Sequence, residues 1–336
     1  MSTIDTAQAA EVARAVALLR AGELVGMPTE TVYGLAADAS NPAAVARIFA
    51  AKGRPADHPV IVHLPDATDM SSQLSRWARE IPPAAQALAA AFWPGPLTLI
   101  LKRQPDVSDL ITGGQDTVGL RVPAHPLAQA LLKAFGSGLA APSANRFGRI
   151  SPTTAAHVRD ELGPAVAMVL DGGPCPVGIE STIVDLSGDV PRILRPGRIS
   201  AAQVAAIVGP LAGGDSRQGT GTTPRVSGSL DAHYAPRTPM QLCAGQAFVD
   251  ALAGTRIDER VGVLSMRTAR NDARFVWRTM PGEAAPYATA LYAALRTLDG
   301  AGCDRLIVEA PPQEPVWLAV NDRLHRAATG AGHSAG

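Results

Sequence analysis

A stretch rich in glycine and threonine divides this chain of 336 residues into two parts. Between about Pro210 and Pro239 the sequence contains a glycine pair, single glycines and several threonines and serines, a composition typical of a linker. Apolar runs of strand and helix length lie on both sides of it. We therefore expect three segments, which are an N-terminal domain over 1–209, a linker over 210–239 and a smaller C-terminal domain over 240–330.

One motif in this linker, His233-Tyr234-Ala235-Pro236, is unlike its surroundings. A segment that only spaces two domains needs no aromatic side chains. The motif therefore predicts either a segment that folds back onto a site or an incidental apolar anchor.

The N-terminal part predicts a mixed sheet rather than the regular alternation of a doubly wound fold. Apolar runs predict strands over 24–28, 60–64, 97–101, 118–122, 138–141, 166–170, 181–186 and 192–195. The last two are too close in sequence for a crossover helix, so we expect them to pair antiparallel. After the linker, strand and helix patterns predict a small α/β domain. The expected fold class is α/β, with a mixed, twisted sheet flanked by helices and a smaller C-terminal α/β domain.

Hydroxyl side chains follow the first predicted strand, and two cations follow the next predicted helix. The strand should stop at Pro28, which cannot donate to a ladder, and Thr31 lies in the turn beyond it. The helix predicted over 42–52 places Lys52 and Arg54 close together at its C-terminal end. Hydroxyls and cations of this kind suit a ligand that carries both an amine-carboxylate and phosphates.

Composition argues against several classes of protein. The formal net charge is zero, so no overall basic field would hold a nucleic-acid backbone. Cys175, Cys243 and Cys303 are too widely spaced for a disulfide framework or a zinc site, and free thiols fit a reducing cytoplasm.

Known targeting and catalytic motifs are also missing from the sequence. The first 20 residues have helical spacing and acidic side chains rather than the pattern of a signal peptide, and no apolar run approaches the length that spans a bilayer. The sequence contains no Gly-x-Ser-x-Gly elbow, no carboxylates at metal-ligand spacing and no Walker A loop. We expect a cytoplasmic protein that makes no membrane contact and has no metal-ligating residues of its own.

Six short segments carry a more specific signal. They occur in order over about 170 residues and are 28–35, 52–55, 92–98, 141–145, 178–185 and 195–197. Together they resemble the YrdC/Sua5 family, the threonylcarbamoyl-AMP synthases. The His-Tyr-Ala-Pro motif followed by a small α/β domain resembles the longer, Sua5-type members. The resemblance implies a YrdC-like N-terminal domain and a Rossmann-like Sua5 domain after the linker.

This resemblance implies a reaction and its partners. Members of the family are nucleotidyltransferases that convert L-threonine, bicarbonate and ATP into threonylcarbamoyl-AMP, pyrophosphate and water. We expect Mg²⁺ to arrive with ATP and to be held through the phosphates. The product would pass to the tRNA threonylcarbamoyltransferase complex, which modifies the adenosine next to the anticodon, so little direct tRNA binding is expected.

The resemblance also implies roles for individual residues. L-threonine would be held by Thr31, His63, Arg121, Ala141 and Ser181. ATP would be surrounded by Lys52, Arg54, His58, Thr117, Ser143, Asn145, Ser151, Arg195 and Tyr234. Lys52 and Arg54 are expected to act catalytically on the phosphates, and Tyr234 is expected to close the linker over ATP.

Two other functions stay open at this point. The chain could be a double-stranded RNA-binding or ribosome-maturation module, because a concave basic surface serves either role. It could also be an enzyme that makes a carbamoyl-adenylate with a different amine substrate. Each residue alone also has an ordinary structural interpretation, such as a core histidine for His63 or a turn residue for Ser143.

Overall fold

A computed structural model of the chain describes residues 4–66, 69–213, 223–228 and 230–332. These residues form two compact units. The first unit consists of the chain up to Arg146, of Pro152–Pro176 and of the part that begins at Glu180. The second unit consists of Phe147–Ser151, of Val177–Ile179 and of the part that begins at Leu230. The expected linker is therefore shared between the two units. Its residues 214–222 and 229 lie outside the described part.

The described part of the first unit is built on a nine-stranded mixed sheet with the order β7-β1-β2-β6-β3-β5-β4-β8-β9. The strands are β1 (Val25–Met27), β2 (Gly34–Asp38), β3 (Ile61–His63), β4 (Leu97–Lys102), β5 (Thr117–Arg121), β6 (Leu139–Ala140), β7 (Met168–Val169), β8 (Thr182–Asp185) and β9 (Arg192–Arg195). Three neighbouring pairs are parallel, namely β1 with β7, β3 with β5 and β4 with β8, and the others are antiparallel. The mixed sheet and the antiparallel pairing of β8 with β9 confirm the sequence predictions.

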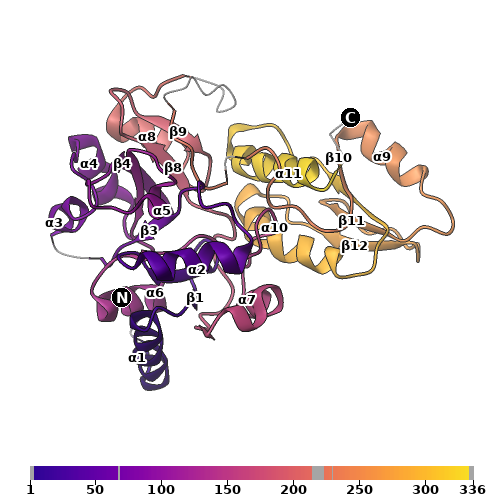
Figure 1. Cartoon of the computed structure of the whole chain (residues 1–336). Coiled ribbons are helices and arrows are strands. Elements are labelled where there is room, and N and C mark those ends of the chain that lie inside the picture. Colours follow the sequence, from indigo (N-terminus) through magenta and orange to yellow (C-terminus); the bar gives the residue numbers. More distant parts are fainter. Residues whose placement is uncertain (1–3, 67–68, 214–222, 229, 333–336) are drawn as a thin grey trace. The chain divides into compact units, whose positions relative to one another are not determined.

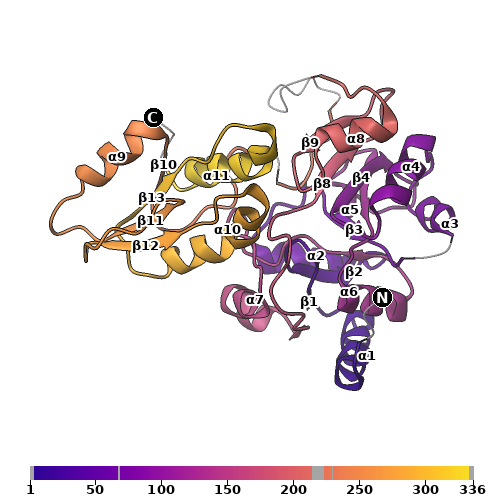
Figure 2. The ribbon, with the colours of Figure 1, turned by 180° about the vertical axis from the view of Figure 1, so that it is seen from behind.

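Helices cover both faces of this sheet (Figures 1 and 2). They are α1 (Thr6–Arg20), α2 (Pro42–Lys52), α3 (Met70–Ser75), α4 (Pro83–Phe92), α5 (Asp109–Thr112), α6 (Pro126–Phe135), α7 (Ala155–Leu162), the 3-10 turn η1 (Gly163–Ala165) and α8 (Ala201–Val208). Helices α1 and α6 pack together in one apolar cluster, and a larger cluster gathers α2, α3, α4, α7 and α8 on β-strand side chains.

The start and end of α2 follow from capping chemistry. The Asn41 side chain accepts hydrogen bonds from the backbone N–H groups of Ala43 and Ala44, and Pro42 occupies the first turn. Gly53 ends the helix with a φ of 62°, a left-handed conformation that glycine adopts without strain. The helix therefore ends at Lys52, and Gly53 alone separates Lys52 from Arg54.

Strand β2 was missing from the sequence prediction. Its residues Gly34–Asp38 are mostly small, and all but Asp38 are buried, so no alternation of apolar and polar side chains indicates a strand. Its place is fixed by tertiary pairing, because β1 lies antiparallel on one side and β6 on the other.

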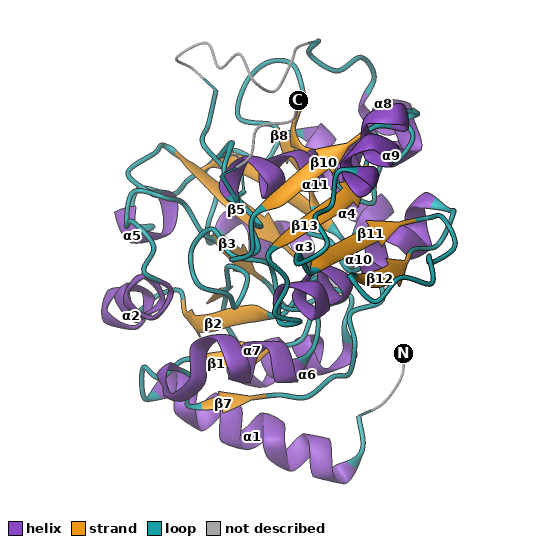
Figure 3. Ribbon diagram, turned by 90° about the vertical axis from the view of Figure 1, so that its right-hand side faces the viewer, coloured by secondary structure: helices purple, strands orange, loops and turns teal. Residues whose placement is uncertain are grey.

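The second unit contains a four-stranded parallel sheet with the order β10-β13-β11-β12 among its described residues (Figure 3). Its elements are β10 (Met240–Cys243), α9 (Gly245–Ala253), β11 (Val261–Ser265), β12 (Phe275–Thr279), α10 (Ala284–Asp299), β13 (Arg305–Glu309), η2 (Pro315–Trp317) and α11 (Leu318–Gly330). Helix α9 packs on the side chains of Val261 and Val263, and α10 packs on the other face of β11, where Leu298 lies beside Gly262. Helix α10 also packs with α11. The expected small α/β domain is confirmed.

Across the helices that the structure describes, none combines the length and the apolar character that crossing a membrane requires.

Candidate functional site

The turn after β1 is held by its own hydroxyl groups. Thr29 Oγ1 donates to the Val32 carbonyl at 2.6 Å and lies 2.9 Å from Thr31 Oγ1. Arg121, the last residue of β5, donates to Thr31 Oγ1 at 2.9 Å and to Glu30 Oε1 at 2.5 Å. The turn thus presents a threonine hydroxyl and a buried guanidinium side by side.

His63 and Ala141 lie near the two ends of the short strand β3, and only His63 lies level with Arg121. His63 is the register partner of Arg121 in the parallel pair of β3 and β5, and Ala141 donates from its backbone to the Ile61 carbonyl at 3.0 Å. Burial, with the nearby Arg121 charge, lowers the pKa of His63 to about 3. The imidazole is therefore neutral at physiological pH, and its buried Nδ1 has no hydrogen-bond partner among the described residues.

Ser181 directly precedes β8, the strand that lies between β4 and β9. Its hydroxyl lies 2.7 Å from Thr98 Oγ1, while Arg195 donates to the Ser181 carbonyl at 3.0 and 3.1 Å and to its hydroxyl at 3.1 Å. Arg195 also donates to the Ser227 carbonyl at 2.7 Å. The five residues predicted to bind threonine are thus linked by direct hydrogen bonds or neighbouring strands within one unit.

The predicted phosphate cations belong to the same unit. Lys52 Nζ donates to the carbonyls of Ser143 and Asn145 at 2.5 Å each, and so connects the end of α2 to the loop 142–145. Burial, followed by the charge of Arg54, lowers the pKa of Lys52 well below its usual value of 10.5. Arg54 is itself buried and donates to the Pro59 carbonyl at 2.8 Å.

The loop 142–145 also pairs with the turn that carries Thr31. Leu35 donates from its backbone to the Pro142 carbonyl at 2.7 Å, and Ala144 donates to the Tyr33 carbonyl at 2.8 Å. The same loop accepts the two hydrogen bonds from Lys52. The loop therefore connects Lys52, a predicted ATP residue, to the turn that carries Thr31, a predicted threonine residue.

A segment of the expected linker covers the sheet beside Thr117. Gln115 accepts from the Arg225 backbone N–H at 2.6 Å and donates to the Arg225 carbonyl at 3.0 Å. Val226 is buried against Ile100, Ile183 and Leu194, and Thr117 and Val226 line one small cavity. Nothing in the glycine- and threonine-rich composition indicated that this segment would dock.

His58, another predicted ATP residue, lies close to Arg54 and Arg225. It is partly exposed, and burial together with Arg54 lowers the pKa of its imidazole. Arg225 reaches toward the same loop, with Nη1 3.7 Å from Asp57 Oδ2.

Ser151 and Tyr234 belong to the second unit and are described with it. Tyr234 is buried, its ring stacks on Tyr292 at 5.7 Å between centroids, and the Arg323 guanidinium lies 5.2 Å from its ring centroid. Its φ of 62° makes it the one non-glycine residue with a positive φ in the described part of the chain. The predicted contact of Tyr234 with ATP stays a prediction.

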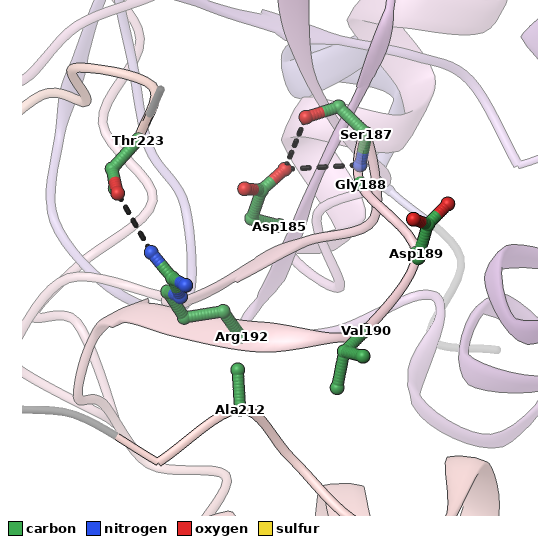
Figure 4. Close-up of a pocket in the computed structure, with 8 residues that line it drawn as sticks. All are labelled: Asp185, Ser187, Gly188, Asp189, Val190, Arg192, Ala212 and Thr223. Carbon is green, nitrogen blue, oxygen red and sulfur yellow. Dashed lines mark hydrogen bonds between the residues drawn. The ribbon is translucent and has the colours of Figure 1, made fainter. Parts of the chain in front are cut away.

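Two further observations bear on metals and ligands. No group of three or more His, Cys, Asp or Glu side chains in the described ranges could hold a metal ion. A pocket of about 560 Å³ lies at the turn between β8 and β9, where Arg192 donates to Thr223 at 2.6 Å and Asp185 accepts from Ser187 (Figure 4). None of the predicted site residues lines it, so it is separate from the candidate site.

Sequence reasoning missed Glu30 as part of the site. Its carboxylate accepts from Arg121 and, at 3.0 Å, from the backbone N–H of Ala124. The available signal was its position next to Thr31 in a short turn between apolar strands, where a buried carboxylate requires a cationic or N–H partner.

Each of the two parts of the chain matches a known protein-family model. Residues 17–197 match the Sua5, YciO and YrdC family model, described as "Telomere recombination". Residues 199–329 match the model described as "Threonylcarbamoyl-AMP synthase, C-terminal domain".

Individual relatives match over nearly their full length. A Bacillus subtilis protein named Threonylcarbamoyl-AMP synthase is 40% identical over 95% of this chain and 93% of its own. The Pyrococcus abyssi protein of the same name is 38% identical over 93% and 92%. The crystal structure of P. abyssi Sua5 complexed with L-threonine matches with a TM-score of 0.87 and 34% identity, over 100% of this chain and 98% of that chain.

Proposed function

The chain belongs to the Sua5-type threonylcarbamoyl-AMP synthases, and from this membership we propose that it condenses L-threonine, bicarbonate and ATP into threonylcarbamoyl-AMP. It is an enzyme of this type, a transferase of tRNA processing. The observation that carries the proposed substrates is the near full-length match to P. abyssi Sua5 complexed with L-threonine. The residues predicted to bind threonine all belong to the first unit, which supports the proposal.

For L-threonine we propose recognition of the carboxylate together with several further polar contacts. Arg121 is suited to the carboxylate, because a guanidinium offers parallel donors and only part of its donor set is used by Thr31, Glu30 and Gly95. Neutral His63 can accept a hydrogen bond at its buried Nδ1, which no described residue occupies. Thr31, Ser181 and the Ala141 backbone supply further polar contacts.

For ATP we propose that Lys52 and Arg54 contact the phosphates. Thr117, Ser143, Asn145, Ser151, Arg195, His58 and Tyr234 would complete the nucleotide site. Mg²⁺ would arrive bound to the phosphate oxygens and neutralise part of their charge, which fits a site whose own residues are cations and hydroxyls rather than carboxylates.

The chemistry requires positioning more than a strong base. The threonine amine and bicarbonate form a carbamate with loss of water, and a carbamate oxygen then attacks the α-phosphorus of ATP as pyrophosphate leaves. The carbamate is already an anion, so the protein has to align it and neutralise the charge that develops on the phosphates. Exclusion of water protects the mixed anhydride that forms.

Outside the site, we propose that the enzyme works in the cytoplasm and passes its product to the tRNA threonylcarbamoyltransferase complex. The two alternatives are less well supported. A double-stranded RNA-binding role lacks an overall positive charge, and a different amine substrate finds no support in the threonine complex of the P. abyssi relative.

The proposal is tested by pyrophosphate release from ATP with purified protein, bicarbonate and Mg²⁺, with each amino acid supplied in turn. We expect release to depend on L-threonine, and threonylcarbamoyl-AMP should be detected as the product. Release that depends equally on other amines would replace threonine by another substrate. No release from folded protein, together with salt-sensitive binding of double-stranded RNA, would favour the RNA-binding function.

A further inference from the structure

Helix α10 holds two short segments of the chain that come from far away in the sequence. The first is Phe147–Ser151, which belongs to the second unit although it lies between two parts of the first in the sequence. Arg296 of α10 donates from Nη2 to the Ile150 carbonyl and from Nε to the Ser151 carbonyl at 3.5 Å. One guanidinium therefore bridges two successive carbonyls of a segment that ends in a predicted ATP-binding residue.

The second segment held by α10 is Val177–Ile179. Thr289 donates to the Val177 carbonyl at 3.4 Å. Gly178 has a φ of 79°, and a Cβ placed on it would lie 2.5 Å from the Thr289 Cα and 2.7 Å from the Ala288 carbonyl oxygen. This backbone-to-backbone approach requires glycine, and the segment leads directly into Glu180 and Ser181.

The His-Tyr-Ala-Pro segment is attached to the same body. Ala235 donates from its backbone to the Gly148 carbonyl at 2.8 Å, and Arg149 Nη1 donates to the Pro236 carbonyl at 3.1 Å. Ser151 and Tyr234, the two predicted ATP residues that lie outside the first unit, are thus members of one packed body that includes α10.

We propose that α10 positions the nucleotide-binding residues of this enzyme and that Arg296 is the positioning residue for Ser151. The inference rests on the proposed function, and it gives the C-terminal part of the chain a role in the reaction. Arg296 acts through the backbone of 150–151, so its loss should weaken ATP binding and leave threonine binding unchanged.

The test compares full-length Arg296→Met, Arg296→Lys and a control, Arg305→Met. Arg305 is a partly buried arginine of the same unit whose Nε lies 2.6 Å from Glu259 Oε1, so its substitution also removes a charged hydrogen bond but leaves the contacts of Arg296 in place. In Arg296→Met we expect the KM for ATP to rise about tenfold, the scale of one hydrogen bond to a charged group. The KM for L-threonine should change less than twofold. Arg296→Lys should recover part of the loss, because an ammonium can still donate to one carbonyl.

A second measurement does not depend on turnover. Amide hydrogen exchange of 147–151 should increase in Arg296→Met, while exchange of β11 stays as in the wild type. An unchanged KM for ATP, an equal rise in both KM values, or the same result in Arg305→Met would overturn the proposal. If the wild type itself releases no threonine-dependent pyrophosphate, the proposed function fails first. The amide exchange then shows separately whether Arg296 holds this segment.

Discussion

The Glu30 carboxylate accepts a hydrogen bond from the Arg121 guanidinium at 2.5 Å, and their side chains are only 8% and 4% exposed. The pair joins the turn after β1 to the end of β5. Because both charges are withdrawn from water, each depends on the other for compensation. The carboxylate also fixes the plane of the guanidinium, and the remaining donors of Arg121 are thereby oriented.

Removing the charge of Glu30 should disturb this pair strongly. In Glu30→Gln the new amide places a donor near the Ala124 N–H or near Arg121, and one buried charge loses its partner. We expect a loss in the free energy of unfolding of about 3 kcal/mol, the scale of breaking a buried pair, and a KM for L-threonine raised about tenfold or more. Urea unfolding and pyrophosphate release measure the two effects. An unchanged KM for threonine would remove Arg121 from the carboxylate site.

Arg54 is predicted to act on the phosphates. Arg54→Ala should lower kcat by ~10²–10³, the scale of removing one donor that stabilises the transition state. Arg79→Ala is the control, because Arg79 forms an exposed ion pair with Asp116 on the same unit and should leave kcat near the wild-type value. Wild-type turnover in Arg54→Ala would mean that the phosphates lie elsewhere.

Much of the fold was predictable where local chemistry decides the structure. The bounds of α2 and α6 follow from Pro at the first helical position and Gly after the last one, and the strand β9 follows from its apolar pattern. β2 was not predictable, because its small, buried residues gain their strand geometry only from pairing with β1 and β6. The same holds for segment 147–151, whose membership of the second unit depends on contacts with α10.

The site was predictable by residue type but not by partner. Thr31, Lys52 and Arg54 stand out as hydroxyl and cationic groups near the ends of predicted elements. The sequence contains no signal that Lys52 donates hydrogen bonds to the carbonyls of Ser143 and Asn145, because every residue type has the same backbone carbonyl. Glu30 was missed for the related reason that its role appears only once Arg121, 91 positions away, lies beside it.

His63 should make stability depend on pH below neutrality. Its folded pKa of about 3 lies below the usual 6.5, so between these values the unfolded chain binds a proton that the folded chain does not. Stability from this residue is therefore full above pH 6.5 and falls on acidification, by up to about 1.4 kcal/mol per pH unit.

The measurement for His63 is urea unfolding of the wild type and of His63→Gln at several pH values between 7 and 4.5. Subtracting the variant removes the contributions of the other histidines. We expect the difference in free energy of unfolding between the two proteins to shrink or reverse toward acid pH. A difference that stays constant with pH would mean that His63 is protonated as easily in the folded protein as in the unfolded one.

The last prediction concerns the segment 223–228 on the first sheet. Gln115 makes two hydrogen bonds to the backbone of Arg225, and each such bond contributes about 0.5–1.5 kcal/mol. Gln115→Ala should therefore speed hydrogen exchange of the Arg225 amide about tenfold or more through local opening. Gln104→Ala is the matched control, because Gln104 also donates to a backbone carbonyl of the same unit, that of Ser75 at 2.8 Å. Equal exchange of the Arg225 amide in all three proteins would show that the buried side chain of Val226, a residue of this segment, holds the segment without Gln115. Faster exchange of the Arg225 amide in Gln115→Ala alone would show that the Gln115 side chain holds the segment 223–228 beside Thr117. The KM for ATP of this variant would then show whether the segment assists or opposes nucleotide binding.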